Sequence, residues 1–298
     1  MAAVESSLGA WRGALALEFA VRGGRTIVAE RRHEGPFCIQ RPFHPGDGVC
    51  HVYLLHPPGG LAGGDELVLD TAVANGAASL LTTPAATKFY RSDGPASVQT
   101  QALRVAAGAS LEWLPLDTIL FGGSRARITT DVHLDSGARF AGWEMTSLGR
   151  PLSGDRYATG ALEQRTRIYV DGEPRLLERL AWNAGDALLA APWGVAGFVV
   201  CGALYAYPAD AAVLEQVRHL LGTAATSLDD VDAAARADPP LAAGNAPYCG
   251  ATLLRDLLVV RALGASPEEL RAMFETLWCA IRPAVIARAP CRPRIWRT

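Results

Sequence analysis

The sequence predicts a mainly β protein built from stacked β-repeats, with a few helices chiefly near the C-terminus. Three observations support this fold class. Glycine turns recur at similar intervals through the middle of the chain, apolar residues alternate with polar ones beside those turns, and the apolar period changes to a helical one after about residue 205. We therefore expect one domain, residues 1–298, with a mainly β body over 14–205.

The repeats are marked by Gly76, Gly108, Gly137 and Gly172, each set between two β-patterned segments. Their spacings are 32, 29 and 35 residues. Such a unit cannot bury its own apolar face, so we expect hairpin-like pairs that stack and share one core.

Alternation indicates strands within the units. Ile128, Thr130, Val132 and Leu134 fall on one side of "ITTDVHL", and the residues between them fall on the other. The segment "ALALEFAVRGGRTIVAERR" alternates in the same way around a Gly-Gly turn.

Residues 187–209 form an uncharged run long enough to span a bilayer. Several prolines and glycines interrupt it, and "PWG" is typical of a turn between two buried strands. We therefore favour a core segment over a membrane span.

The C-terminal part, 206–298, is expected to be helical, to contain a mobile loop at about 223–248 and to end in a basic tail. One helix is predicted over 210–222. A second begins at Ser266, which with Glu269 makes a capping box before Pro267 at the first helical position. Its apolar stripe consists of Leu270, Met273, Phe274, Leu277, Trp278 and Ile281.

That stripe permits two interpretations. Core packing explains it most simply. Because it lies near the basic tail "RPRIWRT", the stripe together with Arg294 and Trp296 is also a candidate partner-docking surface.

Composition excludes several classes of function. A net charge of −2 and a pI near 6.3 argue against general binding to nucleic acid or anionic membranes. The six cysteines show no C-x-x-C pair and no disulfide-scaffold spacing, and the N-terminus shows no signal-peptide core, so we expect a cytoplasmic protein with reduced thiols.

Common enzyme motifs are missing, including the nucleophile elbow, the phosphate loop and H-E-x-x-H. On an extended strand Cys50 and His56 would be about 20 Å apart, too far to share one metal ion. Stacking would instead align polar residues at strand ends along one edge or passage, unless they form only a ladder of surface salt bridges. The candidates are Asp65, Lys88, Tyr90, Arg91, Glu112, Asp117, Glu144, Arg150 and Glu178.

Several blocks resemble the UreD family of urease accessory proteins, called UreH in some bacteria. They are "GPFCIQRPF", "CHVYLLHPPGGLAGGD", "TPAATKFYRS", "EWLPLDTILF", "LGRPLSG" and the closing "PRIW", in the family's order and over almost the whole chain.

The resemblance implies a non-enzymatic, cytoplasmic chaperone with a β-helix-like body. Its implied partners are apo-urease, a helical accessory subunit of the UreF type and a nickel-carrying GTPase of the UreG type. No tightly bound cofactor or metal is expected. The resemblance implies that Ni²⁺ passes transiently, with an internal polar passage suggested for the ion, and that the partner uses GTP.

By motif, Asp65, Lys88, Glu144 and Arg150 are the first candidates for the passage or contact surface, with Glu178 following. A shaping loop would place Asp65 there; it consists of Pro57, Pro58, Gly59, Gly60, Gly63 and Gly64. Two other functions stay open. One is a β-solenoid hydrolase or lyase that uses Glu112, Asp117 and Glu144, and the other is a plain structural or carbohydrate-binding β-protein.

Overall fold

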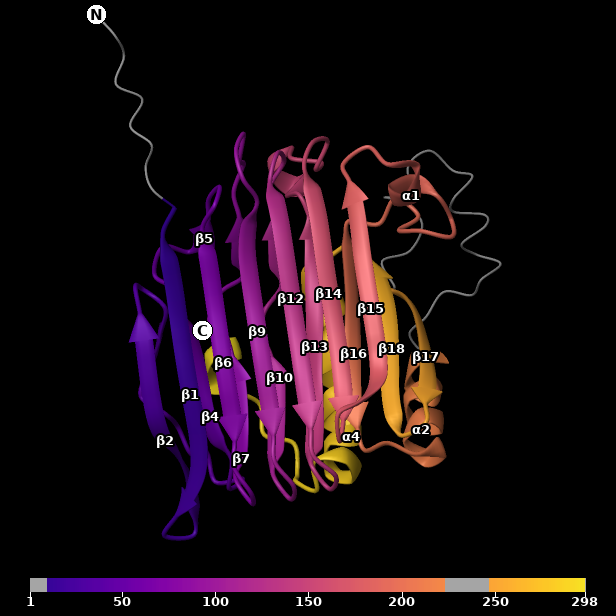
Figure 1. The fold of residues 1–298 in the computed structure, drawn as a ribbon. Helices are drawn as coiled ribbons and strands as arrows, with labels where there is room; N and C mark the ends of the chain where they lie inside the picture. Colours follow the sequence, from indigo (N-terminus) through magenta and orange to yellow (C-terminus); the bar gives the residue numbers. More distant parts are fainter. Residues whose placement is uncertain (1–9, 223–246, 298) are drawn as a thin grey trace, which may run out of the picture.

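The computed structural model describes residues 10–222 and 247–297, which form two large sheets facing each other (Figure 1). The first sheet has the strand order β15-β14-β12-β9-β6-β1-β2. Its strands are β1 (Arg12–Arg22), β2 (Arg25–Glu34), β6 (Glu66–Val73), β9 (Ser97–Val105), β12 (Arg125–Leu134), β14 (Ala161–Val170) and β15 (Glu173–Asn183).

The second sheet has the order β17-β18-β16-β13-β10-β7-β4-β3, and three short strands are attached to it. The main strands are β3 (Cys38–Ile39), β4 (Cys50–Leu55), β7 (Ala78–Thr82), β10 (Ser110–Leu114), β13 (Arg139–Leu148), β16 (Val200–Tyr207), β17 (Tyr248–Leu254) and β18 (Leu257–Gly264). The short ones are β5 (Gly60–Leu61), β8 (Thr87–Phe89) and β11 (Thr118–Leu120).

The predicted repeats are the coils of this body. At Gly76, Gly108 and Gly137, all with positive φ, the chain turns from the first sheet into the second. Each coil then pairs in parallel with the next, as β6 does with β9 and β7 does with β10. The stacked, β-solenoid-like fold is confirmed, but the expectation of hairpin-like pairs is wrong at these three turns, because the two strands beside each turn lie in opposite sheets.

Hairpins close the two edges of the first sheet instead. β1 and β2 pair antiparallel around Gly23 and Gly24, and β14 and β15 pair antiparallel around Gly172. The fourth turn of the predicted series therefore ends the stack rather than continuing it.

The uncharged run 187–209 differs from the expectation of two buried strands. Its first part is the short helix α1 (Ala187–Ala190) followed by turns, and only its second part is a strand, β16. Nowhere in the two described stretches of chain does a helix have the length and apolarity that a membrane span needs.

The C-terminal part contains the two predicted helices, α2 (Ala211–Gly222) and α4 (Pro267–Val285), and ends in the short helix η3 (Arg294–Arg297). Another short helix, η1 (Pro151–Ser153), lies earlier in the chain. Ser266 caps α4 by accepting a hydrogen bond from the Glu269 amide. The part is not purely helical, since β17 and β18 extend the second sheet. The predicted mobile loop at 223–248 lies outside the described residues, except at its end, where Tyr248 begins β17.

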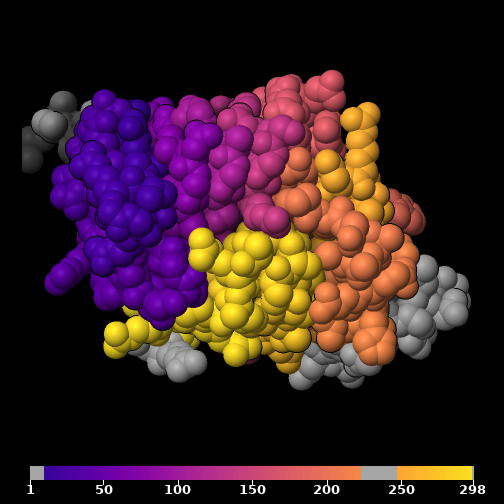
Figure 2. All heavy atoms as spheres, turned by 90° about the horizontal axis from the view of Figure 1, so that it is seen from below, coloured from indigo at the N-terminus to yellow at the C-terminus, as the bar shows by residue number. Residues whose placement is uncertain are grey.

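α4 packs against the outer face of the second sheet and forms a third layer (Figures 1 and 2). In its apolar stripe, Leu270, Phe274, Leu277, Trp278 and Ile281 are at most 1% exposed, and Met273 packs beside them. Core packing is thus confirmed, and this stripe is not available as a docking surface. Trp296 joins the same cluster and donates through Nε1 to Thr82 Oγ1, whereas Arg294 is exposed.

Candidate functional site

Two cavities lie in the interior between the sheets, with volumes of about 310 and 730 Å³. Glu144, Thr146 and Gln164 line both of them. The smaller cavity includes exposed Pro57 in its wall, and the larger includes Trp193, which is 84% exposed. The two cavities therefore meet at Glu144 and approach the surface on opposite sides of it.

A row of polar side chains crosses the first sheet at this level. The strand register places Glu178, Thr166, Thr130 and Gln101 on four neighbouring strands, β15, β14, β12 and β9. The next inward-facing row on one side is apolar and consists of Ile168, Val132 and Leu103. Because stacked coils repeat the same register, single polar residues in successive coils become one continuous polar belt.

Glu144 reaches this belt from β13 of the opposite sheet. Its carboxylate accepts hydrogen bonds from Thr130 Oγ1, from Thr166 Oγ1 at 2.8 Å and from Gln164 Nε2 at 3.1 Å. Burial raises the pKa of Glu144 above its ordinary value of 4.5, although these three donors act in the opposite direction. Glu144 is therefore a buried carboxylate with three hydrogen-bond donors around it.

Glu178 continues the belt toward the larger cavity. It accepts from Tyr205 Oη at 3.1 Å and pairs with Arg261 at 2.8 Å. Arg261 is exposed, so the carboxylate lies between the buried belt and the surface. Two of the nine predicted candidates, Glu144 and Glu178, are therefore brought into one interior site.

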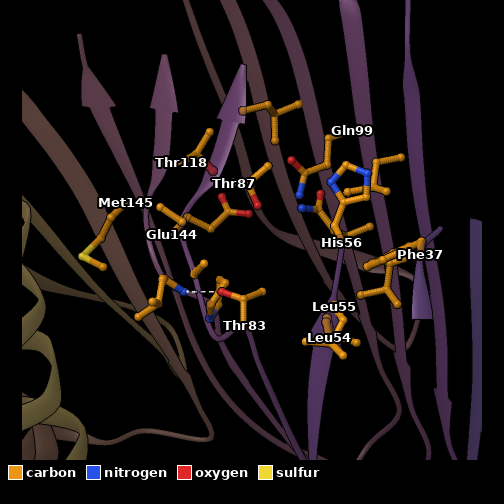
Figure 3. Close-up of a pocket in the computed structure, with 18 of the residues that line it drawn as sticks. Phe37, Leu54, Leu55, His56, Thr83, Thr87, Gln99, Thr118, Glu144 and Met145 are labelled. Atoms are coloured by element: carbon orange, nitrogen blue, oxygen red, sulfur yellow. Dashed lines mark hydrogen bonds between the residues drawn. The ribbon is translucent and has the colours of Figure 1, made fainter. Parts of the chain in front are cut away.

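The smaller cavity is lined by three residues with a polar atom that lacks a protein partner among the described residues, namely His56 Nε2, Gln99 Oε1 and Trp113 Nε1. Figure 3 shows the side chains of His56, Gln99 and Glu144 around this space. Burial lowers the pKa of His56, so the imidazole is neutral near pH 7 and can accept a hydrogen bond or bind a metal ion. Buried polar atoms of this kind require water or an ion.

The shaping loop, residues 57–64, forms part of the wall of this cavity through Pro57 and Gly59. Its glycines permit close packing, since a Cβ at Gly60 would lie 2.7 Å from the backbone oxygen of Lys88. Asp65 fixes the loop by accepting from the amides of Trp11 at 3.2 Å and Ala62 at 2.8 Å. Asp65 is buried and lines neither cavity, so the loop shapes the site without placing Asp65 in it.

The basic and aromatic candidates also lie outside both cavity walls. Tyr90 contacts the edge of the Phe121 ring, and the Arg150 guanidinium lies 3.9 Å from the centre of the same ring. Arg91 is exposed and pairs with Asp93 at 3.2 Å. Lys88 lies in β8 between β5 and β11. These four residues are surface candidates rather than passage residues.

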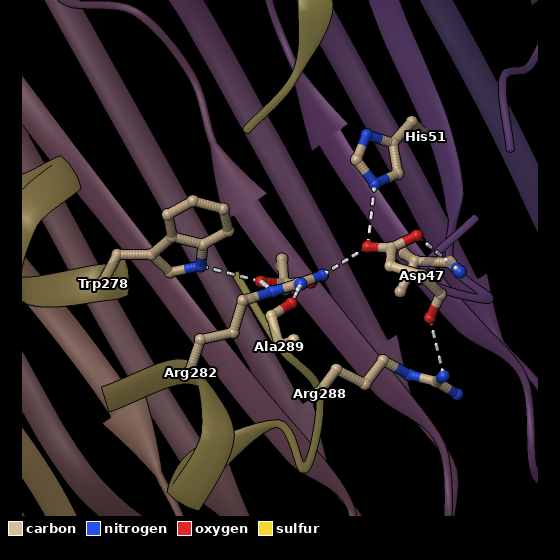
Figure 4. A network of polar contacts seen from close by, with 8 residues as sticks. Asp47, His51, Trp278, Arg282, Arg288 and Ala289 are labelled. Atoms are coloured by element: carbon tan, nitrogen blue, oxygen red, sulfur yellow. Dashed lines mark hydrogen bonds and ion pairs between the residues drawn. The ribbon is translucent and has the colours of Figure 1, made fainter. Parts of the chain in front are cut away.

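Glu112 and Asp117 are separated from Glu144 by the second sheet or its edge. Glu112 faces α4, where Arg282 and Trp278 bind it (Figure 4), and Asp117 accepts from Ser147 Oγ at 2.7 Å. Glu144 faces the opposite side, toward the first sheet. The three carboxylates of the hydrolase or lyase interpretation therefore do not share a site.

The residues that sequence reasoning missed are the neutral members of the belt: Gln99, Gln101, Thr130, Gln164 and Thr166. A signal for one of them was present, since Thr130 occurs on the apolar side of the alternation in 128–134. A polar residue on a buried strand face must find partners in the interior.

The chain is similar over nearly its whole length to a family of known proteins. The family described as UreD urease accessory protein matches residues 12–297. The urease accessory protein UreD of Alkalilimnicola ehrlichii is 47% identical over 288 residues, which are 97% of this chain and 92% of that protein. UreD of Pseudomonas entomophila is 43% identical over 97% and 95% of the two chains, and UreD of Klebsiella aerogenes is 39% identical over 97% of each.

Proposed function

The chain belongs to the UreD family of urease accessory proteins, and we propose that it acts in urease maturation as a scaffold through which nickel reaches the apoprotein. Its relatives are named urease accessory proteins, and in this proposal the chain is likewise an accessory protein rather than an enzyme. Nickel is its cargo in this proposal, and no resident cofactor is required.

The observation that carries the proposal is the polar belt where the two cavities meet. An apolar core is the most stable filling for a β-solenoid, and buried polar groups are costly unless they are satisfied. Here the five neutral members of the belt and two glutamates occupy the interior, and four polar atoms of cavity-lining residues have no protein partner among the described residues. A hydrated passage gives these groups a role that packing alone does not.

The chemistry of the lining suits transfer rather than storage. Carboxylate, amide and hydroxyl oxygens hold borderline divalent ions less tightly than several thiolates or imidazoles do. The lining includes His56, Cys201 and Cys249, but the one cluster of three or more metal-binding side chains found among the described residues lies elsewhere. Ni²⁺ would therefore move from water to Glu144 and onward without being trapped.

We propose apo-urease, a UreF-type helical subunit and a UreG-type GTPase as the partners. Because the α4 stripe is buried, the docking surfaces must be other parts of the chain. Trp193, which is 84% exposed, lines the larger cavity and is the best-placed apolar contact. A partner bound there would cover the opening through which the ion leaves or enters.

The function is tested in cells that make the urease subunits and the other accessory proteins, with and without this chain. We expect urease to be made in both cases, but to be nickel-poor and inactive when the chain is absent. Equal nickel content and activity in its absence would contradict the proposal.

Docking at Trp193 is tested by purifying a tagged form of this chain from such cells and measuring how much of each partner is recovered with it. Trp193→Ser should reduce the amount of co-purified urease or accessory subunit. The matched control is Leu177→Ser, which removes another exposed apolar side chain, 63% exposed, that lines neither cavity. Equal loss with both variants would argue against a specific surface at Trp193.

A further inference from the structure

A second group of metal-binding side chains lies away from the passage. Asp47, His51 and Cys291 each offer one ligand atom, and these atoms lie within 4.8 Å of one another. Asp47 precedes β4, His51 lies in β4 and Cys291 follows α4. None of the three lines either cavity, so this group is separate from the belt.

The spacing within the group fits a metal ion better than a hydrogen bond. His51 Nε2 and Asp47 Oδ2 are 3.4 Å apart, which is long for a hydrogen bond between nitrogen and oxygen. Tetrahedral ligands at about 2.0–2.3 Å from an ion are about 3.3–3.8 Å apart. The imidazole and carboxylate therefore already occupy one edge of such a site, and Cys291 needs to move by only about 1 Å.

The local charge also favours a cation. Arg282 is fully buried and pairs with Glu112 and Asp47, each at 2.8 Å (Figure 4). Both carboxylates are buried, with side chains 1% and 7% exposed, so two negative charges share one guanidinium, and the other buried neighbour of Asp47 is the imidazole of His51. Arg288 donates to the backbone oxygen of Asp47, but it is half-exposed. A divalent ion bound with the Cys291 thiolate would bring this buried cluster to neutrality.

The supporting contacts orient the carboxylate of Asp47. Asp47 Oδ1 accepts from the Val49 amide at 3.1 Å, and Oδ2 accepts from Arg282. Hydrogen bonds of this kind to a ligating carboxylate are typical of metal sites. Cys291 lies outside any helix or strand and is half-exposed, which gives the site both adjustability and an entry path.

We propose that Asp47, His51 and Cys291 bind one exchangeable divalent transition-metal ion and thereby tie the segment after α4 to the β body. Thiolate, imidazole and carboxylate together suit Zn²⁺, Co²⁺ or Ni²⁺ rather than Mg²⁺ or Ca²⁺. Binding replaces the thiol proton of Cys291, which is released to solvent, and water completes the coordination. The inference rests on this chain alone and does not depend on the proposed passage.

The test is a Co²⁺ titration of the purified full-length chain, followed by near-ultraviolet absorption and equilibrium dialysis. We expect a thiolate-to-cobalt charge-transfer band that disappears in Cys291→Ser, together with at least tenfold weaker binding. Cys38→Ser, which changes another half-buried cysteine, should keep both the band and the affinity. Absence of the band in the unmodified chain, or its persistence in Cys291→Ser, would overturn the proposal.

A second variant separates this site from the passage. His51→Asn should weaken Co²⁺ binding by at least tenfold, whereas Glu144→Gln should leave the charge-transfer band unchanged. If the band is lost in Glu144→Gln but kept in His51→Asn, the ion is bound in the interior and not at Asp47, His51 and Cys291.

Discussion

At the residue scale, the buried Arg282 is the centre of the network that joins α4 to the second sheet. Its guanidinium contacts both oxygens of Glu112 and one oxygen of Asp47, and Nη1 donates to the Ala289 carbonyl. Glu112 also accepts from Trp278 Nε1 at 2.7 Å. Burying charges is costly, so this network specifies how α4 sits on the sheet more than it adds net stability.

Removing one hydrogen-bond partner from this network should lower the stability of the folded protein. Glu112→Gln should lower the free energy of unfolding by about 1–3 kcal/mol, because Arg282 keeps Asp47 as its counter-ion but loses its bidentate acceptor. Urea denaturation measures the change. Glu30→Gln, which removes a surface partner of Arg32, should shift the midpoint little. Similar shifts in the two variants would contradict the role given to Glu112.

Glu144 makes stability depend on pH. Its folded-state pKa is raised by burial, so the folded protein holds a proton that the unfolded chain releases above about pH 4.5. The wild-type free energy of unfolding should therefore fall as pH rises from 4.5 through the folded-state pKa. Glu144→Gln should lack this component and gain melting temperature relative to wild type at pH 8, but not at pH 4. An equal difference at both pH values would count against the raised pKa.

Whether a residue's contacts could be predicted depends on how far apart in the sequence the contacting residues lie. Glu144 and Glu178 were among nine candidates that the stacking of repeats suggested, and the resemblance to the family singled them out together with Asp65, Lys88 and Arg150. The pairing of Glu112 with Arg282 joins residues 170 positions apart, and no local pattern indicates it. Asp65 was predicted at the correct corner but with the wrong role, since its carboxylate holds backbone amides rather than facing the cavity.

At the element scale, the shaping loop is fixed by close packing against the segment 88–92. Gly60→Ala should lower the free energy of unfolding by about 1–3 kcal/mol, because the added Cβ would lie 2.6 Å from Tyr90 Cε2 and 2.7 Å from the Lys88 backbone oxygen. Gly94→Ala is the control, since nothing lies within 4 Å of its added Cβ. Thermal unfolding of the pair checks this, and comparable losses would show that the close approach is not the cause.

Elements with a clear period were predictable and the others were not. The coil turns and α4 carry strong local signals, a glycine with positive φ in one case and a capped apolar stripe in the other. β17 was missed because its residues are mostly half-buried and show no clean alternation. A hairpin and a turn into the opposite sheet were not distinguished, because both place a glycine with positive φ between two strands.

At the scale of the whole molecule, each of the three layers has a different structural role. The first sheet supplies most of the polar belt, the second supplies Glu144, and α4 covers the outer face of the second sheet (Figures 1 and 2). The apolar stripe that suggested partner docking is satisfied within the chain. The stripe is therefore not the partner surface, and the surface we propose lies at Trp193 beside the larger cavity.

The central claim is that nickel crosses the interior, and the most direct test fills the passage without removing a charge. Ala203 lines the larger cavity opposite Glu144 in the strand register, and a cavity of about 730 Å³ has room for an indole. Thr129→Trp is the control, because it adds the same group to the outer face of β12, next to inward-facing Thr130.

The measurement is the nickel content of urease matured in cells with each variant, after both variants are shown to fold and to co-purify with urease. We predict nickel-poor urease with Ala203→Trp and normally loaded urease with Thr129→Trp. Full loading with Ala203→Trp would contradict an interior route and would leave the chain as a scaffold that brings its partners together from outside.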